Sequence, residues 1–162
     1  MPIVPFTQLP DSARIWVFGC DRPLIGAPAD TLLASVDQFL SEWRAHGIPL
    51  KCARDWRDDR FLAVGVDVNE ENASGCSIDG LFRTLQQLER VIGSRLVGGG
   101  RVFYRTDSKV EAATREEFLS RVREGAIQRE AMVFDTSLTE ARDWRTKFEQ
   151  PATRSWASKY FM

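Results

Sequence analysis

The chain has 162 residues, of which 43% are hydrophobic and 28% charged, so it can bury a core as one domain with or without an appendage. The net charge of −1 gives no electrostatic reason to expect nucleic acid or an anionic membrane as a partner. Three widely separated cysteines with no C-x-x-C spacing argue against a disulfide framework, and no segment resembles a signal peptide or a membrane span. We therefore expect a cytoplasmic protein with free thiols, no metal, no cofactor and no membrane insertion.

The first third of the chain predicts a strand, a helix and a second strand. Residues 1–12 contain three prolines and are expected to be extended, and RIWVF (14–18) is rich in β-branched and aromatic residues that favour a strand. After Asp30, apolar residues recur at helical spacing as far as Trp43, so a helix is expected to end at His46 and Gly47. A short strand is expected over residues 50–53.

The middle of the chain predicts a hairpin followed by a long helix. Residues 55–60 alternate acidic and basic side chains and are expected to form a turn, and FLAVGVDV (61–68) is apolar enough to be a central strand. The small-residue turn of residues 73–77 leads into an amphipathic helix that ends near Gly93, with Ser77 as its expected cap.

A further strand is expected at RVFYR (101–105), after the three glycines of residues 98–100. The order strand, helix, strand, strand, helix, strand is that of the split β-α-β or ferredoxin-like fold of the α+β class. We therefore expect residues 1–106 to form a four-stranded antiparallel sheet with two helices on one face.

Residues 107–162 are expected to form a C-terminal extension packed on that core. A turn at 107–109, a strand at 110–113 paired with the fourth strand, a capped helix from Thr114 to Gly125 and a strand at 131–134 are predicted. The tail that follows is aromatic and is expected to pack on the body or on another subunit or protein partner, with a homodimer as one alternative. Its aromatic residues are Trp144, Phe148, Trp156, Tyr160 and Phe161.

The first candidate for chemistry is Cys76, at the start of the long helix. A thiolate there is favoured by the helix dipole and by backbone N–H groups. In the expected fold His46, the single histidine, lies at the same end of the sheet, so it is the candidate base of a Cys–His pair. The alternative is structural: Ser77 caps the helix, Cys76 packs as a small apolar side chain and His46 ends a helix.

The same turn is a candidate anion site. The backbone around Gly75 and the hydroxyls of Ser74 and Ser77 could hold a phosphate or carboxylate, although Asp79 opposes this with its own negative charge. The alternative reading is plain helix capping.

A second cluster of charged residues is expected at the other end of the sheet. Paired carboxylates can carry out acid–base chemistry or hold a metal, but here they alternate with arginines, which favours a self-neutralising ion-pair network. The residues concerned are Asp21, Arg22, Arg57, Asp58 and Arg60.

Several short segments, in this order, resemble one family of proteins. They are SARIW (12–16), DRPL (21–24), AHGxPL (45–50), RF (60–61), ASGCSID (73–79), VFD (133–135) and SW (155–156). The family consists of small bacterial proteins commonly labelled "ABC transporter ATPase". The resemblance covers nearly the whole chain and implies an association with such a transporter. It does not imply ATPase activity, because no glycine here is followed by the lysine of a G-x-x-x-x-G-K-[ST] phosphate loop. Where the family has a histidine after Ser-Trp, this chain has Ala157.

From these observations we expect a small binding or accessory module for a partner protein or small ligand. The alternative is a thiol-dependent enzyme that uses Cys76 with His46 as base. Nucleic-acid binding through the open sheet face is disfavoured, because Tyr104 with Arg101 and Arg105 gives the only hint of a basic aromatic surface.

Overall fold

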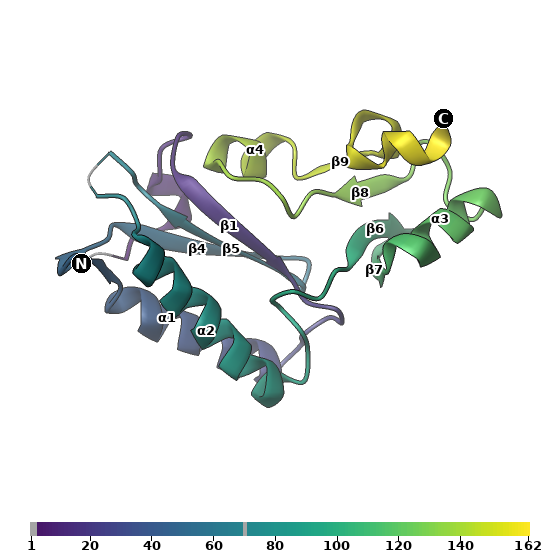
Figure 1. Cartoon of the computed structure of the whole chain (residues 1–162). Helices are drawn as coiled ribbons and strands as arrows, with labels where there is room; N and C mark the ends of the chain where they lie inside the picture. The colour runs from purple at the N-terminus through teal and green to yellow at the C-terminus, as the bar shows by residue number, and fades with distance from the viewer. Residues whose placement is uncertain (1–2, 70) are drawn as a thin grey trace.

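The strand at the centre of the first sheet, β5 (Phe61–Val66), is buried on both faces. It pairs antiparallel with β1 (Arg14–Gly19) on one side and with β4 (Cys52–Arg57) on the other, giving the order β1-β5-β4. The apolar sequence of β5 therefore predicted its central position correctly. The structure is a computed structural model that describes residues 3–69 and 71–162 (Figure 1).

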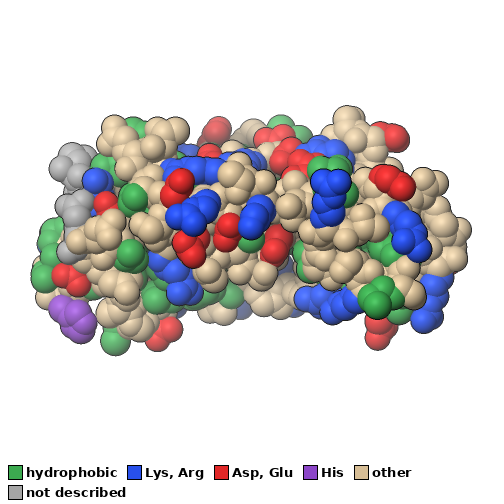
Figure 2. Space-filling model, turned by 90° about the horizontal axis from the view of Figure 1, so that it is seen from above, with side chains coloured by type: hydrophobic (Ala, Val, Ile, Leu, Met, Phe, Trp, Pro, Cys, Tyr) green, Lys and Arg blue, Asp and Glu red, His purple; other side chains and the backbone are tan. Residues whose placement is uncertain are grey.

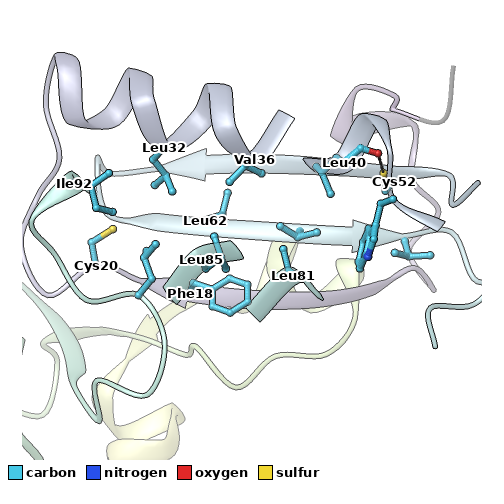
Figure 3. Close-up of a cluster of buried hydrophobic side chains, with 14 of the residues drawn as sticks. Phe18, Cys20, Leu32, Val36, Leu40, Cys52, Leu62, Leu81, Leu85 and Ile92 are labelled. Atoms are coloured by element: carbon cyan, nitrogen blue, oxygen red, sulfur yellow. Dashed lines mark hydrogen bonds between the residues drawn. The ribbon is translucent and has the colours of Figure 1, made fainter. Parts of the chain in front are cut away.

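Two helices, α1 (Ala27–Ser41) and α2 (Gly75–Ile92), cover one face of this sheet (Figure 1). Their apolar stripes meet Phe18 and Leu62 of the strands in a closely packed core, in which the helical residues include Leu32, Val36, Leu40, Leu81 and Leu85 (Figure 3). The amphipathic pattern of both helices thus appears in the structure as one buried face on the sheet.

The second sheet has the strand order β7-β6-β8-β9, and all of its pairings are antiparallel. Its strands are β6 (Val102–Thr106), β7 (Lys109–Ala113), β8 (Met132–Phe134) and β9 (Glu149–Pro151). The helix α3 (Arg115–Arg123) follows β7 and begins with the predicted capping box between Thr114 and Glu117. The described part of the chain also contains the short helix α4 (Ala141–Thr146) and three 3-10 helices, Phe6–Gln8, Ala152–Arg154 and Trp156–Phe161.

The two sheets share a core on the side of the first sheet that faces away from α1 and α2. Phe61 of β5 lies at its centre and contacts the rings of Phe103, Phe134 and Phe148, with centroids 4.9–5.0 Å apart. Trp144 of α4 is fully buried in the same cluster. The face of the first sheet that the sequence suggested was bare is therefore covered.

The predicted four-stranded sheet differs from the structure in its last strand. The residues expected to join β1 form β6, which pairs with β7 on one side and β8 on the other, so neither edge is free for β1. Gly98 and Gly100, with φ values of 68° and 63°, form a turn just before β6. The first sheet keeps the order expected for the ferredoxin-like fold but has three strands, and the second sheet starts inside the range assigned to the core.

The segment around His46 also differs from the prediction. Helix α1 ends at Ser41, and the chain then forms a small hairpin of β2 (Arg44–Ala45) and β3 (Ile48–Pro49). His46 and Gly47 form its two-residue turn, with φ values of 52° and 79°, as primed turns require. The apolar spacing that continued to Trp43 reflects burial of the Trp43 side chain after the helix has ended.

Two smaller boundaries were also predicted wrongly. Strand β4 continues to Arg57, so only the three residues 58–60 form the turn to β5, with Asp58 and Asp59 at positive φ. Helix α2 starts earlier than expected, and its cap is Ser74, whose Oγ accepts a hydrogen bond from the Ser77 backbone N–H at 3.2 Å. In both places the hydrogen bonds of the backbone extend regular structure into residues that resemble turn residues.

None of the helices in the described part of the chain combines the length and the apolar character needed to cross a membrane.

Candidate functional site

The outer edge of β1 is the place where the predicted fourth strand is missing. The Cys20 N–H donates to the Arg60 carbonyl at 2.8 Å, which continues the β1–β5 ladder beyond Gly19. Because the residues that bond to a given neighbour alternate along a strand, residues 14, 16 and 18 also direct their backbone hydrogen bonds to β5. The N–H and C=O groups of Val17 and Gly19 therefore point away from β5. Among the described residues none of these four groups has a hydrogen-bond partner.

Both ends of this free edge are closed by other segments. At the start of β1 the Ile15 N–H donates to the Thr139 carbonyl at 2.9 Å, and beyond its end the Asp21 N–H donates to the Arg95 carbonyl at 3.3 Å. The chain at Thr139 and the chain at Arg95 diverge from β1 between these points, which leaves a gap alongside the strand.

A cavity of about 460 Å³ occupies this gap. It lies between β1, the loop of residues 95–101 and the loop of residues 136–139, and Phe82, Phe103 and Arg115 complete its lining. Its volume is within the range of about 300–1,000 Å³ that is usual for ligand pockets. We call this cavity the β1-edge hollow.

Side-chain and backbone contacts hold both loops in position. The Glu89 carboxylate accepts hydrogen bonds from the backbone N–H groups of Leu96 and Val97, at 2.6 and 3.0 Å. On the other wall, Asp135 accepts a hydrogen bond from the backbone N–H of Ser137 at 2.9 Å. The hollow is therefore formed by anchored loops, which favours a preformed site.

The charge around the hollow is mostly positive. Its lining includes the exposed arginines Arg14, Arg95, Arg101 and Arg115 but a single carboxylate, that of Asp21. The Asp21 carboxylate already accepts hydrogen bonds from Ser94 Oγ at 2.6 Å and from the Arg95 N–H at 3.2 Å.

Most of these arginines are free to bind a ligand. In the part of the chain that the structure describes, the side chains of Arg95 and Arg115 have no ion-pair or hydrogen-bond partner, and Arg14 makes only a stacking contact with Trp16 at 5.1 Å. Arg101 lies 3.7 Å from Glu117, an exposed and therefore weak pair. The arrangement can attract a carboxylate or phosphate, for which the guanidinium fork is suited.

Cys76 and His46, the predicted thiol pair, are both exposed. Cys76 is the second residue of α2, and the Trp43 indole N–H donates to the Ser77 carbonyl at 2.8 Å, so the hairpin carrying His46 begins beside the first turn of α2. No hydrogen bond joins the two side chains within the described residues. The structure thus brings the segments that carry the two residues near one another without a hydrogen bond between their side chains.

The hydroxyl groups of the predicted anion site are engaged in capping. The Ser77 Oγ donates to the Ser74 carbonyl at 2.8 Å, and the Ser74 Oγ accepts from the Ser77 N–H. Gly75 and Asp79 are exposed. Both hydroxyls thus already serve the first turn of α2.

The structure brings the two segments of the predicted charged cluster together. The buried Arg60 guanidinium donates to the Cys20 carbonyl at 3.0 Å, and burial lowers the pKa of Arg60. Arg22 donates to the Ile92 carbonyl at the end of α2, at 3.4 Å, while Asp21 belongs to the β1-edge hollow. These contacts connect the end of β1 to the β4–β5 turn and to α2.

The other two residues of that cluster connect the first sheet to the second half of the chain. Arg57 stacks on the Trp144 ring at 4.1 Å and donates to the Trp144 carbonyl at 2.9 Å. Asp58 accepts a hydrogen bond from Arg105 at 3.2 Å, and Arg105 also donates to both oxygens of Glu149, which raises the pKa of Arg105. Basic and acidic side chains alternate over the face shown in Figure 2, without an extended area of one sign.

The aromatic tail packs largely on its own chain. Trp144 and Phe148 are buried between the sheets, and Trp156 and Tyr160 are half-buried against Phe118. The aromatic residues of β6, Phe103 and Tyr104, are buried as well. Neither the tail nor the strand therefore presents an exposed aromatic platform.

Comparisons of the chain with protein-family models, with curated proteins and with solved structures found no match. Within residues 3–69 and 71–162, no group of three or more histidine, cysteine or carboxylate side chains could hold a metal ion.

The hollow was not found by the sequence analysis. Its four arginines come from three separate parts of the chain, namely β1, the loop of residues 95–101 and the start of α3, and only the topology brings them together. A signal existed in the glycine segment of residues 98–100, which was interpreted only as a break before a strand.

Proposed function

We propose that the protein is a binding module and that the β1-edge hollow is its ligand site, with an anionic group as the recognised chemistry. The observation that carries this proposal is the excess of exposed, largely unpaired arginines around a cavity whose one carboxylate is already hydrogen-bonded. A guanidinium recognises carboxylates and phosphates through paired N–H donors, and the concave site concentrates this charge.

An NMR titration of the whole chain with phosphate, citrate and short acidic peptides tests this proposal. At low ionic strength, we expect amide shifts to concentrate in residues 14–19, 95–101 and 136–139 for at least one of these probes. The double variant R95E/R115E should weaken binding by roughly tenfold or more, since it turns attraction into repulsion. Neither side chain has a partner in the described part of the chain, so the fold should persist.

The matched control is R123E. Arg123 is an equally exposed arginine in the last turn of α3 and lies outside the lining of the hollow. Shifts scattered over the surface, or equal losses in R123E and R95E/R115E, would show that the hollow is not the site.

As a second candidate function we propose thiol-dependent chemistry at Cys76 with His46 as base. The specific support is that Cys76 is exposed near the N-terminus of an 18-residue helix, whereas Cys20 and Cys52 are buried. The Cys76 thiolate would be the nucleophile, and backbone N–H groups of the first turn of α2 other than the Ser77 N–H, which donates to the Ser74 cap, would stabilise negative charge on the substrate.

Iodoacetamide labelling of the native protein at neutral pH tests this second candidate. Cys76 should be the site of labelling, and as a nucleophile it should react faster than a free model thiol, with a slower rate in His46→Ala. A rate equal to the model thiol, unchanged by the substitution, removes both the nucleophile and its base. Cys20 and Cys52 provide an internal control because they should label only on unfolding.

We also propose a cytoplasmic location and an association with a transporter. A cytoplasmic location fits three free thiols, and an association with an ABC transporter, implied by the family resemblance, is compatible with a binding module. The aromatic tail offers little surface for a homodimer or partner because most of it packs on its own chain.

A further inference from the structure

The free part of the β1 edge has the hydrogen-bonding pattern of an unpaired strand. Between the contacts at Ile15 and Asp21, the Val17 and Gly19 N–H groups alternate with outward carbonyls. At about 3.3 Å per residue, the stretch from Ile15 to Gly19 spans about 13 Å, enough for a strand of about four residues. Proteins usually cover such an edge, yet here a cavity lies along it.

The walls of the hollow suit the alternating side chains of a strand. Val17, Phe103 and Leu138 provide an apolar wall. The arginines Arg95 and Arg115 add basic side chains to the lining. Successive residues of an added strand would point in opposite directions, so apolar and acidic side chains could each meet a matching surface.

Resting on the function proposed above, we infer that the ligand of the β1-edge hollow is an extended acidic peptide segment of a partner protein. The segment pairs with β1 and takes the place of the missing fourth strand of the first sheet. Backbone hydrogen bonds to Val17 and Gly19 hold it, as in other cases of strand addition, and carboxylates facing Arg95 and Arg115 select an acidic sequence. A small anion would use the arginines but would leave most of the edge groups unpaired.

The experiment is a selection from a displayed library of random nine-residue peptides, with the full-length chain as bait and R95E/R115E as counter-bait. We expect enriched peptides with an excess of Asp and Glu and an apolar residue at alternate positions. They should lose roughly tenfold or more in affinity for R95E/R115E and bind R123E unchanged. No enrichment over background, or enriched peptides without net negative charge, overturns the inference.

Amide hydrogen exchange of the complex with the best enriched peptide tests the mode of binding. In the free protein, the amides of Val17 and Gly19 should exchange faster than those of Trp16 and Phe18, which bond to β5. The bound peptide should slow exchange at Val17 and Gly19 by at least roughly tenfold. Two peptides, each N-methylated on one of the two sets of alternate residues, should differ: the one methylated on the set whose N–H groups face β1 should lose binding, and the other should keep it. Unchanged exchange, or tight binding by both N-methylated peptides, overturns strand addition.

The results separate this inference from the proposed function. If phosphate or citrate shifts the amide signals of residues that line the hollow while no peptide binds, the hollow is an anion site and the strand-addition inference fails. If neither the small anions nor the peptides bind there, both fail.

Discussion

Replacing Phe61 with alanine is expected to lower the free energy of unfolding by about 3–5 kcal/mol, the usual cost of truncating a fully buried phenylalanine. The Phe61 ring contacts Phe103 of β6, Phe134 of β8 and Phe148, the residue before β9. All three lie in the second half of the chain. The substitution therefore leaves a cavity where the two sheets meet. Because domains are commonly stable by only about 5–15 kcal/mol, the effect is a large fraction of the total.

Guanidinium denaturation followed by tryptophan fluorescence and by far-UV circular dichroism measures this effect. We expect one transition that moves to lower denaturant by both probes, because the shared core couples the sheets. Phe61→Leu is the graded control and should cost less than Phe61→Ala, since it retains much of the volume while losing the ring contacts.

A different result would change the description of the fold. If the two probes separate in Phe61→Ala, with one part of the chain unfolding first, the sheets are independent units that merely contact one another. If stability is unchanged, the aromatic cluster around Phe61 does not hold the halves together.

The elements that could be predicted are those with strong local patterns. The long stripe of α2, the uniformly apolar β5 and the capping box at Thr114 each depend on residues close in sequence. Such patterns indicate which face is buried, and tertiary packing here agrees with them.

The elements that were missed depend on contacts distant in sequence. Strand β6 has the pattern of a fourth strand for the first sheet, but β7 and β8 occupy both of its edges. The pairing with β8 joins residues about thirty apart, and no local pattern specifies it. His46 gave a second error, because a histidine followed by glycine suits both the end of a helix and a two-residue turn.

The candidate site shows the same division. Cys76 and the serines around it were noticed because they lie together in the sequence. The β1-edge hollow exists because no strand pairs with the outer edge of β1, and the arginines at positions 14, 95, 101 and 115 line it. Their common location could not be predicted from a sequence in which each looks like an ordinary surface charge.

The second large effect is expected from the two buried thiols. Burial raises the pKa of Cys20 and of Cys52 from 9.0 to about 12. Cys20 lies near Ile92 at one end of the helix-covered core, and Cys52 lies at the other end, where its thiol donates to the Leu40 carbonyl at 3.5 Å (Figure 3). Neither side chain is exposed to solvent in the folded chain.

The sign of the pH dependence follows from these raised values. Below pH 9 both thiols are protonated in the folded and the unfolded chain, so their contribution to stability is fully present. Between about pH 9 and pH 12 the unfolded chain releases both protons while the folded chain retains them, which favours unfolding. From pH 8 to pH 10 we expect the free energy of unfolding to fall by roughly 2–3 kcal/mol, about 1.4 kcal/mol for each thiol.

Denaturant unfolding at pH 8, 9 and 10 under reducing conditions measures this loss. Cys52→Ala should remove about half of the pH dependence, and the double variant Cys20→Ala/Cys52→Ala most of it. Cys76→Ala is the matched control and should leave the pH dependence unchanged, because the Cys76 side chain is exposed in the folded chain as well. An equal loss of stability in the wild type and the double variant would place the alkaline sensitivity in other groups. In that case the two ends of the helix-covered core would have to admit hydroxide or solvent more readily than their packing indicates.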